Sequence, residues 1–302
     1  MTRSQKGRSD TQNAAANSQA HTPGVIASRE NRWLKRFRAA LCGGVPTEEG
    51  AVGVEGVRLV EEALHSGGRV EAVLFSESGV RHREKLAALV GGPEIAFPVL
   101  RTTDRLFAGI ADTEHPQGVA ALVMPRKVQL NELLATPRAA CAPLLVVLVG
   151  VQDPGNVGTI VRTAAAFGAT GAVATTTGQS GTASPFAPKA MRASAGAALH
   201  LPIVSRMALG ILLSQLKLNG IRTFASCVER EEAKTIAPWE ADWCESVALL
   251  VGNEGAGLPK EVVQAADVRI RIPMANEVES LNAGVAAAVV LYEAFRQRME
   301  SA

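Results

Sequence analysis

Polar residues that could carry out chemistry are concentrated in three segments of the C-terminal half of this 302-residue chain. Each segment follows a predicted strand. The segments are DPGNVGTIVRTAAAFGA at 153–169, GNEGAGLP at 252–259 and IPMANEVESLNAGVAAAVVLYE at 272–293. Because ligands of parallel α/β sheets bind at the carboxyl ends of the strands, the three segments are predicted to meet around one site.

Arg162 is the most unusual residue of the first segment. Asn156 suits the N-cap of a helix that continues through small and apolar residues, and Arg162 stands in the middle of that helix. There it shares a face with Gly158 and with the alanines that follow, a small face that a nucleotide or partner backbone could approach. A guanidinium at this place could hold a phosphate or a developing alkoxide through paired hydrogen bonds. A buried ion pair with Glu254 is the structural alternative for Arg162, and a plain helix cap is the alternative for Asn156.

The glycines of residues 252–259 do not form a nucleotide-phosphate loop. Leu258 and Pro259 stand where G-x-x-x-x-G-K-[ST] requires lysine and a hydroxyl, and Glu254 would repel phosphate. The GNVGTI stretch does not match G-x-G-x-x-G either. A dehydrogenase or an ATPase is therefore disfavoured. A ligand whose adenosine is bound mainly by backbone groups is compatible with these glycines, as is a purely structural turn.

The composition is that of an ordinary globular protein of one or two domains, with 47% hydrophobic and 20% charged residues. No apolar run is long enough to span a bilayer, and the first 24 residues lack the apolar core of a signal peptide. The four cysteines include no C-x-x-C pair, and the five histidines are dispersed, with His200 interpreted as a core residue. These features predict a cytoplasmic protein with free thiols, without a bound metal or a membrane segment.

The small net charge of +2 is unevenly distributed. Residues 1–40 carry eight Lys or Arg and two acids, whereas the remaining chain carries 23 basic and 27 acidic residues. A basic N-terminus on a near-neutral body favours a polyanionic partner such as RNA, and a solubilising tail is the alternative. Two basic stretches, RENRWLKRFRAAL and PKAMRAS, supply the predicted RNA contacts, although an exposed charged helix face would explain the second equally well. The predicted contacts are Arg29, Arg32, Lys35, Arg36, Lys189 and Arg192.

Helix and strand patterns divide the chain into two α/β units. Residues 1–28 are polar and predicted to be disordered, with Ser28 as a candidate cap for a short basic helix. Residues 29–125 are predicted to form a small unit with strands VEAVLFS and GVAALVM and helices VEGVRLVEEALHSG and REKLAALVGG. Residues 126–142 form a linker with one or two helical turns. Residues 143–302 are predicted to form a mostly parallel sheet covered by helices on both faces, with strands PLLVVLVG, GAVATT, IRTFASCV, SVALLVG and VRIRI.

In combination, the motifs resemble those of the SpoU/TrmH class of SPOUT RNA methyltransferases. The resemblance rests on N-x-G-x-x-x-R-[ST]-A-x-x-x-G from Asn156, G-N-E-G-x-G-L from Gly252 and I-P-M-x-x-x-x-E-S-L-N from Ile272. PFAPKAMRASAGAALHLPI and the terminal helix also resemble that class. VEGVRLVEEAL and GIADTEHPQGVAAL resemble the small RNA-binding domain that precedes the catalytic domain in many members. The resemblance covers most of residues 30–300, but Asn276 replaces the usual Gly of the third motif, and Ser or Thr is common where Gly284 stands.

This resemblance implies an enzyme that uses S-adenosylmethionine to methylate a ribose 2′-hydroxyl of RNA, without a metal. It also implies a trefoil knot in the C-terminal domain and a homodimer with the active site at the interface. Ribosomal RNA is the favoured substrate, and the alternatives are a transfer RNA methyltransferase or a non-catalytic RNA-binding or ribosome-assembly factor of the same fold. The implied catalytic residues are Asn156, Arg162, Glu254, Ser280 and Asn282. The implied cofactor-binding residues are Gly252, Asn253, Ile272, Pro273, Met274 and Leu281.

The resemblance casts Arg162 as a general base, but arginine hardly deprotonates in proteins. Stabilisation of the forming oxyanion by Arg162, with proton loss to RNA phosphate or water, is the role that we favour. Ser280 and Asn282 open the last helix, so one is expected to cap it while the other reaches the acceptor ribose.

Overall fold

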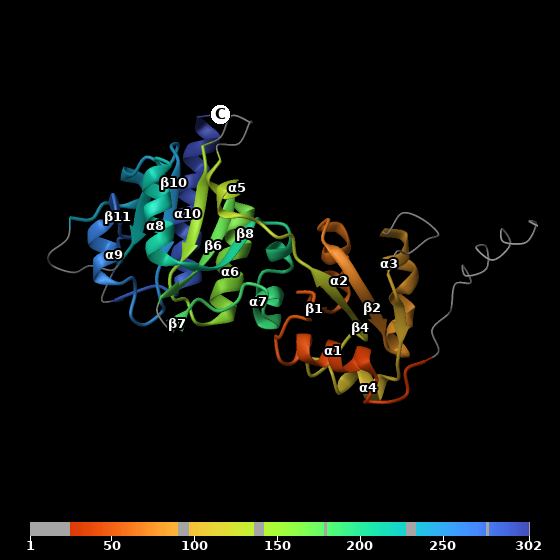
Figure 1. Ribbon diagram of the computed structural model, residues 1–302. Helices are drawn as coiled ribbons and strands as arrows, with labels where there is room; N and C mark the ends of the chain where they lie inside the picture. Colours follow the sequence, from red (N-terminus) through yellow and green to blue (C-terminus); the bar gives the residue numbers. More distant parts are fainter. Residues whose placement is uncertain are drawn as a thin grey trace, which may run out of the picture.

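The computed structural model describes residues 25–89, 97–135, 142–177, 180–227, 234–275 and 278–301. They form two α/β units, which are joined by the segment that carries α5 (Leu130–Leu134) (Figure 1). None of the helices in these ranges is both long enough and apolar enough to cross a membrane.

The N-terminal unit is a four-stranded sheet of order β1-β4-β2-β3. Its strands are β1 (Val52–Glu55), β2 (Arg69–Phe75), β3 (Val99–Arg101) and β4 (Val119–Met124). Its helices are α1 (Arg32–Leu41), α2 (Val57–His65), η1 (Ser78–His82), α3 (Arg83–Leu89) and α4 (Asp104–Ala108). Strand β4 pairs antiparallel with β1 and β2, and alternate β4 residues pack on opposite faces. Ala120 and Leu122 join the cluster under α1, whereas Val119 and Val123 join the one under α2.

The two strands predicted in this unit are confirmed as β2 and β4, but β1 and β3 were not predicted. The predicted helix VEGVRLVEEALHSG begins only at Val57, because Val54 and Glu55 belong to β1. Gly56, with a φ of 94°, turns the chain from this strand into α2.

The predicted disorder of residues 1–28 is wrong at the end of that range. Ile26 is buried, its backbone N–H donates to Arg101 O at 2.8 Å, and Thr102 Oγ1 donates to Ile26 O at 2.9 Å. Residues 25–28 therefore pack along the edge of the sheet, while residues 1–24 lie outside the described residues. Helix α1 also starts later than expected: its N-cap is Asn31, whose side chain accepts from Trp33 N, and not Ser28.

The C-terminal unit is a seven-stranded sheet of order β11-β9-β10-β5-β6-β7, with β8 paired to β6. Its strands are β5 (Leu144–Leu148), β6 (Gly171–Thr177), β7 (Ser180–Gly181), β8 (Ile203–Ala208), β9 (Arg222–Ser226), β10 (Val247–Val251) and β11 (Val268–Ile270). All pairings are parallel except that of β6 with β7. The predicted, mostly parallel sheet is thus confirmed, although β7 and β8 were not predicted.

Helices cover both faces of this sheet, as expected for a buried parallel sheet (Figure 1). They are α6 (Pro154–Ala166), α7 (Pro188–Ala193), η2 (Ala197–Leu199), α8 (Leu209–Leu218), η3 (Pro238–Glu240), α9 (Lys260–Ala265) and α10 (Ala283–Glu300). Leu145 and Val147 of β5 pack in the cluster that contains α8 and α9 residues. Leu144 and Val146 pack in the cluster that contains residues of α6, α7 and α10.

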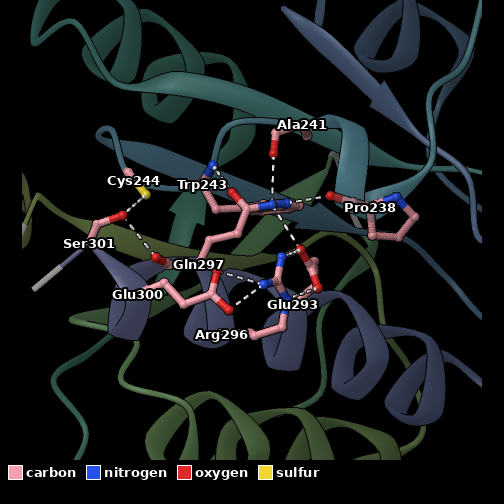
Figure 2. Close-up of polar contacts among 9 residues, drawn as sticks. All are labelled: Pro238, Ala241, Trp243, Cys244, Glu293, Arg296, Gln297, Glu300 and Ser301. Atoms are coloured by element: carbon pink, nitrogen blue, oxygen red, sulfur yellow. Dashed lines mark hydrogen bonds and ion pairs between the residues drawn. The ribbon is translucent and has the colours of Figure 1, made fainter.

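The end of α10 is held by a polar clamp on the segment that leads into β10 (Figure 2). The indole of Trp243 is buried and donates to Pro238 O at 2.8 Å. Gln297 accepts from Trp243 N at 3.1 Å and donates to Ala241 O at 3.1 Å. The next residue, Arg298, donates to the carbonyl oxygens of Ala142, Pro143, Trp243 and Glu245. The clamp fixes α10 relative to β5 and β10, whose carboxyl ends carry the functional loops.

Candidate active site

Helix α6 begins three residues earlier than its sequence pattern predicted. Asp153 is the N-cap, with its carboxylate accepting from Gly155 N at 3.1 Å, and Pro154 takes the first helical position, which suits its fixed φ. The interpretation of Asn156 as the cap is therefore wrong, and its side chain is free for other contacts. Lys189 of α7 donates to Asp153 at 2.6 Å, and this hydrogen bond is the main reason that the pKa of Asp153 lies below its ordinary value.

The loop after β10 is a tight turn organised by Asn253. The Asn253 side chain accepts from the N–H groups of Gly255 and Ala256, both at 2.9 Å, and donates to Gly150 O of the loop after β5 at 2.9 Å. A Cβ on Gly252 would lie 2.4 Å from Leu258 N, so only glycine allows the chain to fold back here. The loops that follow β5 and β10 are thus bound to one another.

One hydrogen-bonded network joins the three predicted segments. Asn156 Nδ2 donates to Glu254 Oε1 at 2.9 Å, and Asn282 Nδ2 donates to Asn156 Oδ1 at 2.9 Å. Asn282 Oδ1 also accepts from Gly284 N at 2.9 Å and so caps α10. The structure therefore brings together one polar side chain from each motif, at the carboxyl edge of the sheet.

Glu254 is held in its ionised form by this network. Burial alone would raise the pKa of Glu254, but hydrogen bonds from the Asn156 amide and from backbone N–H groups outweigh burial and lower it. Two of these bonds, from Gln152 N at 3.2 Å and Asp153 N at 3.1 Å, come from the turn before α6. Because Glu254 accepts the amide N–H of Asn156, the Asn156 oxygen faces Asn282.

Arg162 lies apart from the network. Its side chain is exposed, and within the described ranges it makes neither a hydrogen bond nor an ion pair. Six residues separate it from Asn156, a rise of about 9 Å along the helix. The alternative of a buried ion pair with Glu254 is therefore wrong. Ser280, the other predicted polar residue, is exposed and without a hydrogen bond to a described residue.

The predicted cofactor residues lie on the same loops as the network. Gly252 and Asn253 form the β10 turn, while Ile272 packs partly buried against the core. Pro273 and Leu281 are exposed and Met274 is half-buried; Asn276 lies outside the described residues. Within the described ranges, no group of three or more His, Cys, Asp or Glu could hold a metal ion.

The predicted RNA contacts fall into two kinds. Arg29 and Arg32 are exposed, and Lys35 pairs with Glu30 at 2.5 Å on the surface of α1. Three of the six side chains form ion pairs with distant residues of the same chain: Arg36 with Glu49 and Glu71, Lys189 with Asp153, and Arg192 with Asp112. These pairs were not predicted, because each joins residues that are separated by 13 or more positions along the chain.

Comparison with known proteins places both domains of the chain in known families. The SpoU rRNA Methylase family profile matches residues 143–292, and that of the MRM3-like substrate binding domain matches residues 47–121. The chain is 32% identical over 269 residues to the Bacillus subtilis 23S rRNA (guanosine(2553)-2′-O)-methyltransferase RlmP, covering 88% of this chain and 97% of that protein.

Solved structures of RNA methyltransferases resemble this chain over most of its length. The AdoMet-bound rRNA methyltransferase from Sinorhizobium meliloti superposes with a TM-score of 0.75 at 28% identity, covering 90% of this chain and 97% of that one. The SpoU methyltransferase AviRb from Streptomyces viridochromogenes superposes with a TM-score of 0.73 at 27% identity, covering 90% and 99% of the two chains.

Proposed function

The chain belongs to the SpoU rRNA methylase family, and from this premise we propose that it transfers a methyl group from S-adenosylmethionine to a ribose 2′-hydroxyl of ribosomal RNA. The resemblance drawn from the motifs is thereby confirmed. The observation that carries the proposal is the hydrogen-bonded network in which Asn156, Glu254 and Asn282 join the three motif segments.

The cofactor is proposed to bind on the loops after β10 and β11. Gly252, Ile272 and Leu281 would present backbone groups, and Asn253, Pro273 and Met274 would shape the pocket. An adenosine fits this set because Gly255 and Gly257 leave the backbone open, with no bulky side chain over it, while Ile272 and Leu281 offer apolar surface. The bound cofactor supplies a methyl group on a positively charged sulfur.

Arg162 is proposed to act at the acceptor oxygen. As the proton leaves the ribose 2′-hydroxyl, negative charge develops on the oxygen, and a guanidinium within hydrogen-bond distance would stabilise that charge until the oxygen bonds to the methyl group and the methyl–sulfur bond breaks. The proton leaves to RNA phosphate or water, because an arginine hardly deprotonates in proteins and is a poor base. Ser280 is proposed to bind the acceptor ribose, since its hydroxyl is exposed at the start of α10.

A homodimer is proposed to complete the site. Apolar side chains of α10, together with Leu281 just before its N-cap, form an exposed stripe: Leu281 (36% exposed), Val285 (47%), Val289 (40%) and Tyr292 (55%). Helix α6, which carries Arg162, packs beside α10, with Phe167 and Tyr292 in edge-to-face contact at 5.6 Å. A second copy seated on this stripe would cover it and bring its own Arg162 to the network of the first copy.

The dimer has its own test. Val289→Glu should convert the protein to monomers in light scattering and abolish methyl transfer, while an exposed apolar residue elsewhere, as in Leu218→Glu, should leave the dimer intact. A wild-type protein that is monomeric and fully active would contradict the proposal.

RNA is proposed to bind the N-terminal domain, residues 29–125, joined by a linker at 126–142 to the catalytic domain at 143–302. An open groove of about 350 Å³ on this domain is lined by Ala27, Arg29, Thr103, Arg105 and Leu106. Two exposed arginines at a groove suit a phosphate backbone. Arg32 and Lys35 would extend this surface along α1.

A trefoil knot is also proposed for the C-terminal domain. Strand β11 is at the edge of the sheet, two strands beyond β10, yet Asn282 at the start of α10 reaches Asn156 next to β5. Asn282 thus lies on the far side of β9 and β10 from β11, a placement that a trefoil knot would explain. We place the protein in the cytoplasm, where ribosomal RNA is available.

Two measurements test the proposed function. Mapping of ribose methylation in total RNA, with and without the gene, should reveal one unmethylated ribosomal position in the deletion strain. Purified protein with radiolabelled S-adenosylmethionine should then label that ribosomal RNA in vitro. Labelling of transfer RNA alone would shift the substrate to transfer RNA, and absence of both labelling and cofactor binding would favour a non-catalytic RNA-binding factor.

A further inference from the structure

Helix α7 lies between the two domains and carries two cations one helical turn apart (Figure 1). Lys189 reaches into the catalytic domain and pairs with Asp153 at 2.6 Å. Arg192 reaches the other way and pairs with Asp112 of the N-terminal domain. A single short helix thus holds one carboxylate from each domain.

The Asp112 end is firmly attached to the N-terminal sheet. Glu55 of β1 is only 7% exposed, and it accepts from Asp112 N at 2.8 Å and from the Thr113 hydroxyl. A buried carboxylate with such partners is costly to displace, so the loop that carries Asp112 moves with the sheet. The side chains of Arg192 and Asp112 are themselves only about one-third exposed, at 35% and 29%.

The other face of α7 is attached just as closely to the catalytic site. A Cβ on Gly158 of α6 would lie 2.3 Å from Ala190 O, so the two helices touch backbone to backbone. Asp153, the partner of Lys189, donates its own N–H to Glu254 at 3.1 Å. A displacement of α7 would therefore be transmitted to the network of Asn156 and Glu254.

We propose that Arg192 and Asp112 are positioning residues, whose ion pair fixes the RNA-bound domain relative to the methyl-transfer site through α7. The inference rests on the proposed function. RNA held by one domain must present its 2′-hydroxyl to groups on the other, and a misplacement of about 1 Å costs about a hundredfold in rate. The pair then acts on turnover of bound RNA and not on the binding of RNA or cofactor.

A second contact between the domains provides a matched control. His200 and Glu62 lie 2.9 Å apart, with exposures of 40% and 35% that are close to those of the first pair, so the interpretation of His200 as a core residue is wrong. Their contact joins α2 to the end of η2, and among the described residues neither side chain bonds to α6 or to the network. Breaking it removes an interdomain contact of similar kind without loosening α7.

The test uses the full chain, radiolabelled S-adenosylmethionine and deproteinised ribosomal RNA from a strain that lacks the gene. Arg192→Gln and Asp112→Asn should each lower kcat about tenfold, while the Kd values for RNA and cofactor stay within about twofold. The charge swap Asp112→Arg with Arg192→Asp should restore kcat to within about threefold of wild type. Glu62→Gln should change kcat by less than about twofold.

Three results would overturn the inference. Arg192→Gln with wild-type kcat would show that the pair does not position the RNA. If Arg192→Gln weakens RNA binding and the charge swap weakens it further, Arg192 contacts an RNA phosphate and does not act through Asp112. Equal losses of kcat in Arg192→Gln and Glu62→Gln would show that any weakened contact between the domains lowers the rate, and that α7 has no special part in it. If wild-type protein methylates neither ribosomal nor transfer RNA, it is the proposed function that fails, whatever the variants do.

Discussion

Replacement of Gly158 by alanine tests the close packing of α6 on α7. The added methyl group would lie 2.3 Å from Ala190 O, 2.6 Å from Ala193 Cβ and 3.0 Å from Ser194 N. Two of these neighbours are backbone atoms, so no side chain can rotate away. The helices must separate by at least about 0.7 Å to reach the shortest contact that real Cβ atoms show.

The expected change in the free energy of unfolding of Gly158→Ala follows from two opposing effects. Overpacking a tight interface costs about 1–3 kcal/mol, whereas alanine in place of glycine inside a helix gains about 1 kcal/mol. The net loss in free energy of unfolding is therefore about 0–2 kcal/mol, and the contacts of the added methyl group with backbone atoms place it above zero. Gly210 of α8 is the control, because a Cβ there meets nothing within 4 Å and Gly210→Ala should gain about 0.5–1 kcal/mol.

The two variants can be compared by urea unfolding, followed by circular dichroism. Gly158→Ala should unfold at lower urea than wild type and Gly210→Ala at higher urea, with equal slopes. Because α7 also carries Lys189 and Arg192, Gly158→Ala should lower methyl transfer as well. A Gly158→Ala protein at least as stable as Gly210→Ala would show that the two backbones are not in contact, and the reasoning about α7 would fail with it.

Three further predictions concern charge. The pKa of Glu254 is lowered in the folded protein, so its stabilising contribution is present above its unfolded pKa of about 4.5 and is lost as pH falls through the lower folded value. Glu254→Gln should therefore make the free energy of unfolding less dependent on pH below about pH 5, and an unchanged acid slope in urea titrations would contradict this. Arg298→Met leaves four backbone carbonyls without their charged donor and should cost about 2–4 kcal/mol in calorimetry, with wild-type stability as the contrary result. Arg29→Gln with Arg32→Gln should reduce the salt slope of RNA binding by about 1 per residue, and an unchanged slope would place the RNA elsewhere.

The sequence was most informative about the catalytic sheet. Runs such as PLLVVLVG and SVALLVG are apolar throughout, which is typical of strands covered on both faces, and they are β5 and β10. The loops that follow them meet as expected because parallel strands place their carboxyl ends at one edge. Strand β8 was missed, since its pattern is interrupted by Arg206, which sits at a register shift with a φ of 60°.

Other features could not be predicted, for physical reasons. The VGVE of β1 is short and runs directly into an amphipathic helix, so periodicity alone joins the two. The pairing of Arg192 with Asp112 spans 80 residues, and composition does not say which distant charges approach one another. For the same reason the sequence named Lys189 and Arg192 but gave no reason to expect partners inside the chain.

We propose that the exposed Arg162 stabilises the oxyanion during methyl transfer. Single-turnover transfer to ribosomal RNA by Arg162→Ala, together with calorimetric titration of the cofactor, tests it most directly. We expect cofactor affinity within about threefold of wild type and transfer slower by at least about a hundredfold, the usual cost of removing one charge-stabilising donor. Wild-type transfer rates in Arg162→Ala would show that Arg162 does not stabilise the oxyanion.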